Sequence, residues 1–234
     1  MSITVGGVSC EYELYQSEGT DTVVFLHGWG GDLRSFAGAY RAACAWGVTC
    51  LNLAFPKKVP PSWGIYEYAE HVGGVLISLG IENPIIVGHS FGGRVGIILA
   101  ARGAVKKLVL VDSAGMKPRF SLKKKLAIAS YHRAVKKGKT LDGFGSADYN
   151  NIERDMRGVF VRVVNTYLEN LLPYIRCPSL IFWGKDDKDT PVYMAKRLNK
   201  GISGSALITV PGGHYSYIDA PYAFSQALKT FVLD

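Results

Sequence analysis

Short runs rich in apolar and β-branched residues alternate along the chain with longer segments in which apolar residues recur at helical spacing. The apolar runs cover residues 23–26, 48–53, 84–87, 108–111, 180–183 and 206–210. Helices are predicted over residues 33–45, 65–79, 93–101, 192–198 and 221–232. Strands that alternate with helices in this way are typical of parallel sheets with helices on both faces. The pattern therefore predicts an α/β fold with a mostly parallel central sheet, preceded by a hairpin around Gly6 and Gly7.

The alternation stops between Ala114 and about Pro173, where the chain is basic, helix-prone and without a convincing strand. A structureless connection of this length is improbable inside a compact domain. We therefore expect a core formed by residues 1–113 and 174–234, with residues 114–173 inserted as a helical cap. Aromatic and soft apolar residues of the insertion either pack the cap onto the core, which is their default role, or line a pocket: Met116, Phe120, Tyr131, Phe144, Tyr149, Met156, Phe160 and Tyr167.

Composition narrows the class of protein. With 234 residues and 48% hydrophobic content, the chain can bury a sizeable core. Its longest apolar runs are too short to cross a bilayer, and its N-terminus lacks the pattern of a secretory signal. The four cysteines show neither a C-x-x-C pair nor zinc-site spacing. We expect a cytoplasmic protein with reduced thiols and no bound metal.

The formal net charge of +8 is concentrated in one stretch that has no acidic residue between Ser113 and Leu141. Such a stretch either forms a solvated face or attracts an anionic substrate, a carrier-linked substrate or a membrane surface. Nucleic acid is a poor candidate partner, since the stretch shows no helix-turn-helix, zinc or ribonucleoprotein motif. Its basic residues are Lys117, Arg119, Lys123, Lys124, Lys125, Arg133, Lys136, Lys137 and Lys139.

The sequence Gly88-His89-Ser90-Phe91-Gly92 carries the strongest chemical signal, because an apolar run enters it and a helix-capable run leaves it. A serine on a sharp turn between a strand and a helix projects its hydroxyl beyond the sheet, and the flanking glycines leave room for that turn. The N-terminus of the helix then favours developing negative charge. Ser90 is therefore the candidate nucleophile.

A serine nucleophile needs an imidazole to take its proton and a carboxylate to orient that imidazole. His214 is the best candidate base, because it follows Pro211-Gly212-Gly213 directly after the last predicted strand. Asp187 is the preferred acid in the loop after residues 180–184, and Asp186 is the second choice. Asp112, at the end of the neighbouring strand, is a rival acid whose other expected task is hydrogen bonding to the loops.

The glycine-rich turn after residues 23–26, His27-Gly28-Trp29-Gly30-Gly31, lies at the same predicted sheet edge. We expect the backbone N–H groups of Trp29 and Phe91 to form an oxyanion hole. The side chains of Trp29, Phe91 and Tyr215 are also candidates for contacting the substrate. A phosphate-binding loop is disfavoured, since no G-K-[ST] follows and the G-x-G-x-x-G spacing is absent.

Taken in order, H-G-W-G, G-H-S-F-G-G, W-G-K-D-D and G-G-H resemble the α/β-hydrolase family over nearly the whole chain. The resemblance implies the order nucleophile, acid, histidine, and it favours Asp187 because the acid is usually the third residue after the glycine that ends its strand. It also implies a cap after Asp112 and no metal or organic cofactor. Dehalogenases and epoxide hydrolases of this fold have aspartate at the nucleophile position, so Ser90 argues against both.

The resemblance implies a carboxylesterase-like serine hydrolase that cleaves small or medium acyl esters through an acyl-enzyme. Hydrolysis of a thioester, a lactone or a carbon–carbon bond is the nearest alternative, and a ligand-binding protein without turnover is the alternative from another class. Residues 52–58 depart from the Asp-x-Pro-Gly-x-Gly-x-Ser loop that many family members have. Substrate preferences of relatives therefore do not carry over to this chain.

Overall fold

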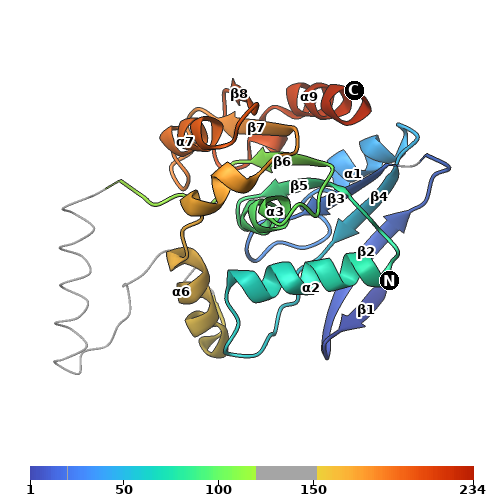
Figure 1. Ribbon diagram of the computed structural model, residues 1–234, viewed down its shortest axis with the longest axis vertical. Helices are drawn as coiled ribbons and strands as arrows, with labels where there is room; N and C mark the ends of the chain where they lie inside the picture. Colours follow the sequence, from blue (N-terminus) through green and yellow to red (C-terminus); the bar gives the residue numbers. More distant parts are fainter. Residues whose placement is uncertain (20, 120–151) are drawn as a thin grey trace.

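The computed structural model describes residues 1–19, 21–119 and 152–234, and within them eight strands form one sheet (Figure 1). The strands are β1 (Ser2–Val5), β2 (Val8–Tyr15), β3 (Thr22–Leu26), β4 (Thr49–Leu53), β5 (Ile85–His89), β6 (Lys107–Val111), β7 (Ser179–Gly184) and β8 (Ala206–Val210). Their order is β1-β2-β4-β3-β5-β6-β7-β8. The pairs β1–β2 and β2–β4 are antiparallel and the others are parallel, so the predicted hairpin and mostly parallel sheet are confirmed.

Helices cover both faces of this sheet, as the sequence pattern predicts. They are α1 (Ala37–Cys44), α2 (Ile65–Ser78), α3 (Phe91–Ala101), α6 (Arg157–Asn165), α7 (Tyr193–Gly201), α8 (Ser216–Asp219) and α9 (Pro221–Leu233), with 3-10 helices η1 (Arg154–Met156) and η2 (Glu169–Tyr174). One buried cluster contains side chains of α1 and α9, and a larger one contains side chains of α2, α3 and α7. Every residue of β5 and β7 is buried between these layers, which explains why their sequences are mostly apolar.

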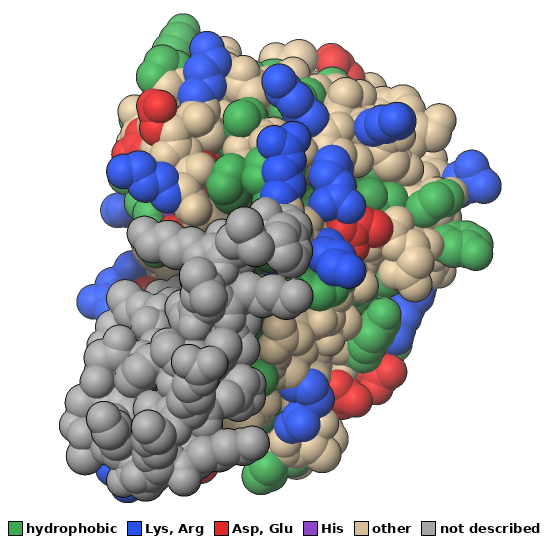
Figure 2. Space-filling view, turned by 90° about the vertical axis from the view of Figure 1, so that its left-hand side faces the viewer, with side chains coloured by type: hydrophobic (Ala, Val, Ile, Leu, Met, Phe, Trp, Pro, Cys, Tyr) green, Lys and Arg blue, Asp and Glu red, His purple; other side chains and the backbone are tan. Residues whose placement is uncertain are grey.

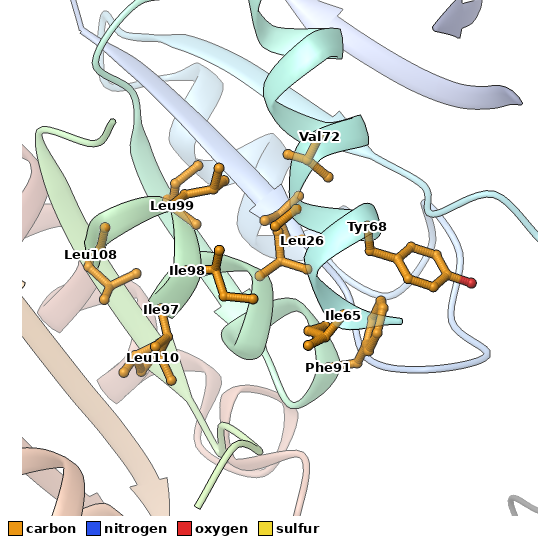
Figure 3. Close-up of a cluster of buried hydrophobic side chains, with 14 of the residues drawn as sticks. Leu26, Ile65, Tyr68, Val72, Phe91, Ile97, Ile98, Leu99, Leu108 and Leu110 are labelled. Atoms are coloured by element: carbon orange, nitrogen blue, oxygen red, sulfur yellow. The ribbon is translucent and has the colours of Figure 1, made fainter. Parts of the chain in front are cut away.

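Figure 3 shows how the larger cluster fixes the helix that follows Ser90. Side chains of α3 pack between the sheet and α2, so the position of α3 is set by apolar contacts on two sides. The labelled members come from β3, α2, α3 and β6: Leu26, Ile65, Tyr68, Val72, Phe91, Ile97, Ile98, Leu99, Leu108 and Leu110.

The first helix is shorter than the sequence predicts. Instead of beginning at residue 33, α1 begins at Ala37. The Asp32 carboxylate accepts a hydrogen bond from the Arg34 backbone N–H at 2.9 Å, and the Ser35 N–H donates to the Asp32 carbonyl at 3.0 Å. Such local side-chain bonds offer the backbone an alternative to helix, and here they form a turn in place of the predicted first helical turn.

Only part of the predicted cap, residues 114–173, is described. In that part, the guanidinium of Arg162 on α6 donates to the Trp63 carbonyl at 3.0 Å, which ties α6 to the loop before α2. The division into core and cap stays a prediction. None of the helices in the described ranges combines the length and apolar character needed to span a membrane. Several residues singled out above lie outside the described residues: Phe120, Lys123, Lys124, Lys125, Tyr131, Arg133, Lys136, Lys137, Lys139, Phe144 and Tyr149.

Candidate active site

Ser90 lies on a sharp turn between β5 and α3. Its backbone has φ +48° and ψ −105°, in the left-handed half of the Ramachandran plot that non-glycine residues rarely occupy. The glycines around it permit a close approach of backbone segments, since a Cβ on Gly92 would lie 2.1 Å from the Leu26 carbonyl oxygen. A Cβ on Gly88 would lie 2.5 Å from the Gly92 carbonyl oxygen. The turn therefore holds Ser90 at the carboxyl end of β5 by backbone geometry.

Three side chains that are far apart in the sequence meet at this edge of the sheet. The Ser90 Oγ lies 3.0 Å from His214 Nε2, and His214 Nδ1 lies 2.9 Å from Asp187 Oδ2. Asp187 comes from the loop after β7 and His214 from the loop after β8. The neighbouring Asp186 is exposed. The arrangement can pass a proton from a hydroxyl to an imidazole whose other nitrogen faces a carboxylate.

The Asp187 carboxylate is buried and fully hydrogen-bonded. Its Oδ1 accepts the backbone N–H of Asp189 at 2.8 Å and that of Thr190 at 2.9 Å. Burial alone would raise its pKa, but the bonds from His214 and Thr190 outweigh burial and lower the pKa below its ordinary value. Burial also works against the protonated form of His214, yet the hydrogen bond and charge of Asp187 keep the pKa of His214 above its ordinary value.

Thr190 is a site residue that sequence reasoning missed. Its Oγ1 lies 2.7 Å from Asp187 Oδ2 and 3.2 Å from His214 Nδ1. The Trp183 indole fixes the Thr190 backbone by donating to its carbonyl at 2.7 Å. A signal was available, because a hydroxyl residue three positions after an aspartate in a loop can close a local hydrogen-bonded turn around that aspartate.

The rival acid, Asp112, binds the two loops that carry the acid and the histidine. Its Oδ1 accepts the Gly184 N–H at 2.8 Å, where β7 ends. Its Oδ2 accepts the Ser216 N–H at 2.9 Å and the Ser216 hydroxyl at 2.6 Å, two residues after His214. Burial raises the pKa of Asp112 to about 6, although these hydrogen bonds act against the shift. The Asp112 carboxylate thus links the loop after β7 to the loop after β8 by hydrogen bonds.

Two buried histidines support the backbone around Ser90. His89 Nε2 lies 2.7 Å from the His214 carbonyl oxygen, and since a carbonyl only accepts, this nitrogen carries the hydrogen. Burial, together with the charge of His214, lowers the pKa of His89 to about 3, so it stays neutral. His27 Nδ1 lies 2.6 Å from the Gly28 carbonyl oxygen, and its Nε2 accepts the Phe55 N–H at 3.1 Å. These bonds fix the glycine-rich turn.

Of the two predicted oxyanion donors, Trp29 belongs to this turn and Phe91 is the first residue of α3. The Gly92 N–H donates to the His27 carbonyl at 3.1 Å and the Gly31 N–H to the Gly28 carbonyl at 3.1 Å. Within the described ranges, the N–H groups of Trp29 and Phe91 have no acceptor. Their rings meet edge to face with centroids 5.1 Å apart. Both N–H groups are thus available to a ligand.

Two cavities meet at Trp29 and Phe91, which line both of them. One cavity of about 340 Å³ contains Ser90 and His214, and its wall combines apolar side chains with the polar residues Arg94, Asp189 and Thr190. The other, of about 260 Å³, is lined by the glycine-rich turn and by Phe55 and Tyr68. Tyr215, a predicted substrate contact, is not among the described residues that line either cavity. Its ring lies against His89, with centroids 5.1 Å apart, and 53% of the residue is exposed.

Asp187, Asp189 and His214 also offer potential metal-ligand atoms within 4.8 Å of one another. His214 Nδ1 and Asp187 Oδ2 already face each other across a 2.9 Å hydrogen bond. A metal would have to displace this bond. The geometry therefore favours proton transfer over metal binding at these residues.

Comparison with known proteins agrees with this architecture. The sequence model of the Alpha/beta hydrolase family matches residues 23–227. The chain belongs to the alpha/beta hydrolase family. This alpha/beta hydrolase is 26% identical over 262 residues to the uncharacterized hydrolase YugF of Bacillus subtilis (strain 168), a match that covers 98% of the chain and 96% of the relative.

Two further proteins are similar to this chain over most of its length. The pimeloyl-[acyl-carrier protein] methyl ester esterase of Wigglesworthia glossinidia brevipalpis is 23% identical, with coverage of 92% of this chain and 94% of the relative. Among solved structures, the enol-lactonase from Burkholderia xenovorans LB400 superposes with a TM-score of 0.79 at 20% identity, with 100% of both chains covered. At this identity the superposition establishes the shared fold.

Proposed function

We propose that this alpha/beta hydrolase cleaves small or medium carboxylic esters through an acyl-enzyme on Ser90. The observation that carries the proposal is the continuous contact from Ser90 Oγ to His214 Nε2 at 3.0 Å and from His214 Nδ1 to Asp187 Oδ2 at 2.9 Å. A serine hydroxyl is a weak nucleophile on its own, and this contact chain supplies both the base and the group that orients it.

In the first half-reaction, Ser90 Oγ attacks the carbonyl carbon while its proton moves to His214 Nε2. The carbonyl oxygen becomes negative and accepts hydrogen bonds from the N–H groups of Trp29 and Phe91. The Asp187 carboxylate stabilises the imidazolium that forms. The tetrahedral intermediate then expels the alcohol, whose oxygen takes the proton from His214, and Ser90 remains acylated.

In the second half-reaction, water replaces the alcohol beside His214. The imidazole takes a proton from the water, whose oxygen attacks the acyl carbon. The same two N–H groups bind the oxyanion, and the Ser90 Oγ leaves with the proton returned by His214. The products are a carboxylic acid and free enzyme, so atoms and protons balance without a cofactor.

The size and lining of the cavities support a compact substrate. The cavity of about 340 Å³ next to Ser90 lies at the lower end of the range for small-molecule sites, and its wall combines apolar side chains with several polar ones. The second cavity beyond Trp29 and Phe91 offers separate space for the other half of an ester. A methyl ester esterase and an enol-lactonase are among the proteins similar to this chain, and both names refer to substrates with an ester bond.

An anionic or carrier-linked substrate belongs to the same proposal. Figure 2 shows Lys and Arg side chains gathered over the part of the surface where α7 lies. Exposed basic residues in this region include Lys196, Arg197 and Lys200 on α7, with Lys117 and Arg119 nearby. A positive surface raises the local concentration of anionic ligands. Thioester hydrolysis would use the same steps, with a thiol as leaving group.

The test is hydrolysis of p-nitrophenyl acetate, butyrate and octanoate, followed by lactone and thioester substrates of matched acyl length. We expect release of p-nitrophenolate that Ser90→Ala abolishes, with the shorter esters preferred. Thioester or lactone turnover that exceeds ester turnover would reassign the substrate class while keeping the mechanism. Folded wild-type protein that turns over none of these carbonyl compounds would favour a ligand-binding protein without hydrolysis.

A further inference from the structure

Arg94 is a buried cation in the wall of the cavity that contains Ser90 and His214. It lies on α3, four residues after Ser90, and only 6% of the residue is exposed. Among the described residues that line this cavity, it is the one lysine or arginine. A rise of 1.5 Å per helical residue places its Cα about 6 Å along α3 from Ser90. A positive charge is therefore built into the cavity within reach of a bound ester.

The bonds that Arg94 makes within the described residues use only part of its capacity. Its Nη1 donates to the Thr166 carbonyl at 2.5 Å and its Nη2 to the Val164 carbonyl at 3.3 Å. A guanidinium has five N–H donors. Two donors thus bind the C-terminal end of α6, and the other three have no protein acceptor in the part of the chain that the structure describes.

Arg94 also lacks a paired carboxylate among the described residues, since no ion pair includes it. Tyr167 and, to a smaller extent, Glu169 are close enough to favour its charged form, but the Glu169 Oε1 already accepts the Lys117 N–H at 2.6 Å and the Arg197 guanidinium at 2.9 Å. Burial lowers the pKa of Arg94 to about 10, which still leaves it charged at neutral pH. A buried charge is costly unless it is paired.

Anchoring α6 accounts for the two bonds to carbonyl oxygens, but a neutral donor could make such bonds without the cost of a buried charge. A ligand carboxylate, in contrast, would supply the missing counter-charge and accept two of the remaining N–H groups in bidentate geometry. The acidic residue of the lining, Asp189, has its carboxylate within 4.8 Å of ligand atoms of Asp187 and His214. The negative charge of Asp189 therefore lies beside Asp187 and His214.

We propose that Arg94 binds a carboxylate that the substrate carries away from the scissile ester. This inference rests on the proposed esterase function and narrows its substrate class to monoesters of dicarboxylic acids and related anionic esters. Arg94 acts here as a specificity-determining residue, and the reaction at Ser90 follows the same steps. The adjoining apolar wall would accommodate the methylene chain between the two ends.

The experiment compares pairs of p-nitrophenyl esters that differ only at the far end of the acyl chain. One member carries a free carboxylate and the other the neutral primary amide, for acyl chains from succinate to suberate. A second set places the carboxylate on the alcohol side, as in the acetate ester of 6-hydroxyhexanoate and its amide. Each variant is described by the ratio of kcat/KM for acid over amide, so that a general loss of activity cancels.

We expect wild-type protein to prefer the acid by about tenfold or more at the best chain length, as charged hydrogen bonds in a buried site do. Arg94→Gln should bring the ratio to one or below, and Arg94→Lys should keep part of the preference. A wild-type ratio near one in both sets, or an unchanged ratio in Arg94→Gln, would overturn the inference. In that case, Ser90-dependent hydrolysis of the esters that carry a terminal amide would still support the esterase proposal.

A binding measurement covers the outcomes in which Arg94→Gln does not fold or no ester is hydrolysed. In the Ser90→Ala protein, with Arg94 intact, calorimetry should show adipate binding more tightly than its monoamide, and added salt should weaken the difference. Equal binding of the two compounds, or binding of neither, would contradict a carboxylate site at Arg94. If wild-type protein hydrolysed no ester while Ser90→Ala bound adipate selectively, the result would count against the esterase proposal alone.

Discussion

The Thr190 hydroxyl lies 2.7 Å from Asp187 Oδ2, the same oxygen that His214 Nδ1 contacts at 2.9 Å. One carboxylate oxygen therefore faces a hydroxyl and the candidate base together. The Thr190 N–H donates to the other oxygen, Oδ1, at 2.9 Å. Thr190 thus fixes the plane of the carboxylate against which the imidazole is oriented, and it acts as a positioning residue.

Thr190→Val should lower kcat by about tenfold while changing KM little, because the hydroxyl orients the acid without contacting the reacting bond. Loss of this donor leaves more negative charge for His214, so the acid limb of the pH–rate profile should move to higher pH. Thr190→Ser keeps the hydroxyl and should restore both quantities to near wild-type values. An unchanged pH profile in Thr190→Val would show that the hydroxyl does not act through the Asp187 carboxylate.

The pH dependence of the reaction follows from the Asp187–His214 contact. His214 must be neutral to accept the Ser90 proton, so kcat/KM should rise with pH through the pKa of His214. Because Asp187 holds that pKa above the ordinary histidine value, the acid limb should be centred above about pH 6.5.

Asp187→Asn removes the charge that stabilises the imidazolium. Its acid limb should move to lower pH, and its plateau should fall by at least about 100-fold. The exposed Asp186 offers a matched control, since Asp186→Asn should leave both the midpoint and the plateau near wild type. If both substitutions shifted the midpoint equally, the Asp187–His214 contact would not be the cause of the pH dependence.

Asp112 should stabilise the loops that carry Asp187 and His214 more than it affects the proposed chemistry directly. Asp112→Ala leaves the buried N–H groups of Gly184 and Ser216 without an acceptor and should lower the free energy of unfolding by about 2 to 4 kcal/mol. Urea unfolding measures this change, and kcat should fall in parallel because both loops loosen. A stability close to that of wild type, within about 0.5 kcal/mol, would contradict the bracing role.

The turn around Ser90 should tolerate no side chain at Gly92. A Cβ there would lie 2.1 Å from the Leu26 carbonyl oxygen, so the backbone of β3 or α3 would have to move. We expect Gly92→Ala to lower the free energy of unfolding by at least about 2 kcal/mol and to abolish activity.

Gly38 in α1 provides the matched control, because a Cβ there would meet nothing within 4 Å. Gly38→Ala should therefore be neutral or stabilising by up to about 1 kcal/mol. Thermal unfolding of both variants makes the comparison. Equal stability changes at the two glycines would argue against a sterically closed turn.

Sequence reasoning reached the fold because its signals are local. Strands such as β5 and β7 are mostly apolar because helices cover both of their faces, and the structure places them within a residue or two of their predicted limits. The predicted start of α1 was wrong, because a hydrogen bond to the Asp32 side chain competes with helix formation. Such a bond leaves no trace in hydrophobic periodicity.

The candidate site could be predicted in part for a related reason. Parallel strands end at the same edge, so Ser90, His214 and an acid of the loop after β7 could be proposed as neighbours, and the family resemblance favoured Asp187. Thr190, the two-loop contacts of Asp112 and the burial of Arg94 depend on side-chain positions in three dimensions, which no spacing encodes. The substrate contact expected of Tyr215 stays a prediction, since its ring lies 5.1 Å from that of His89 and 5.6 Å from that of His214.

The most direct test of the account is covalent labelling of Ser90. A fluorophosphonate should add one equivalent to folded wild-type protein, with the modified peptide containing Ser90. Ser90→Ala should not react, and His214→Gln should react more slowly by at least about 100-fold, because the hydroxyl then lacks its base. Labelling at another residue, or equal labelling rates in wild type and His214→Gln, would contradict a nucleophile activated by the Asp187–His214 pair.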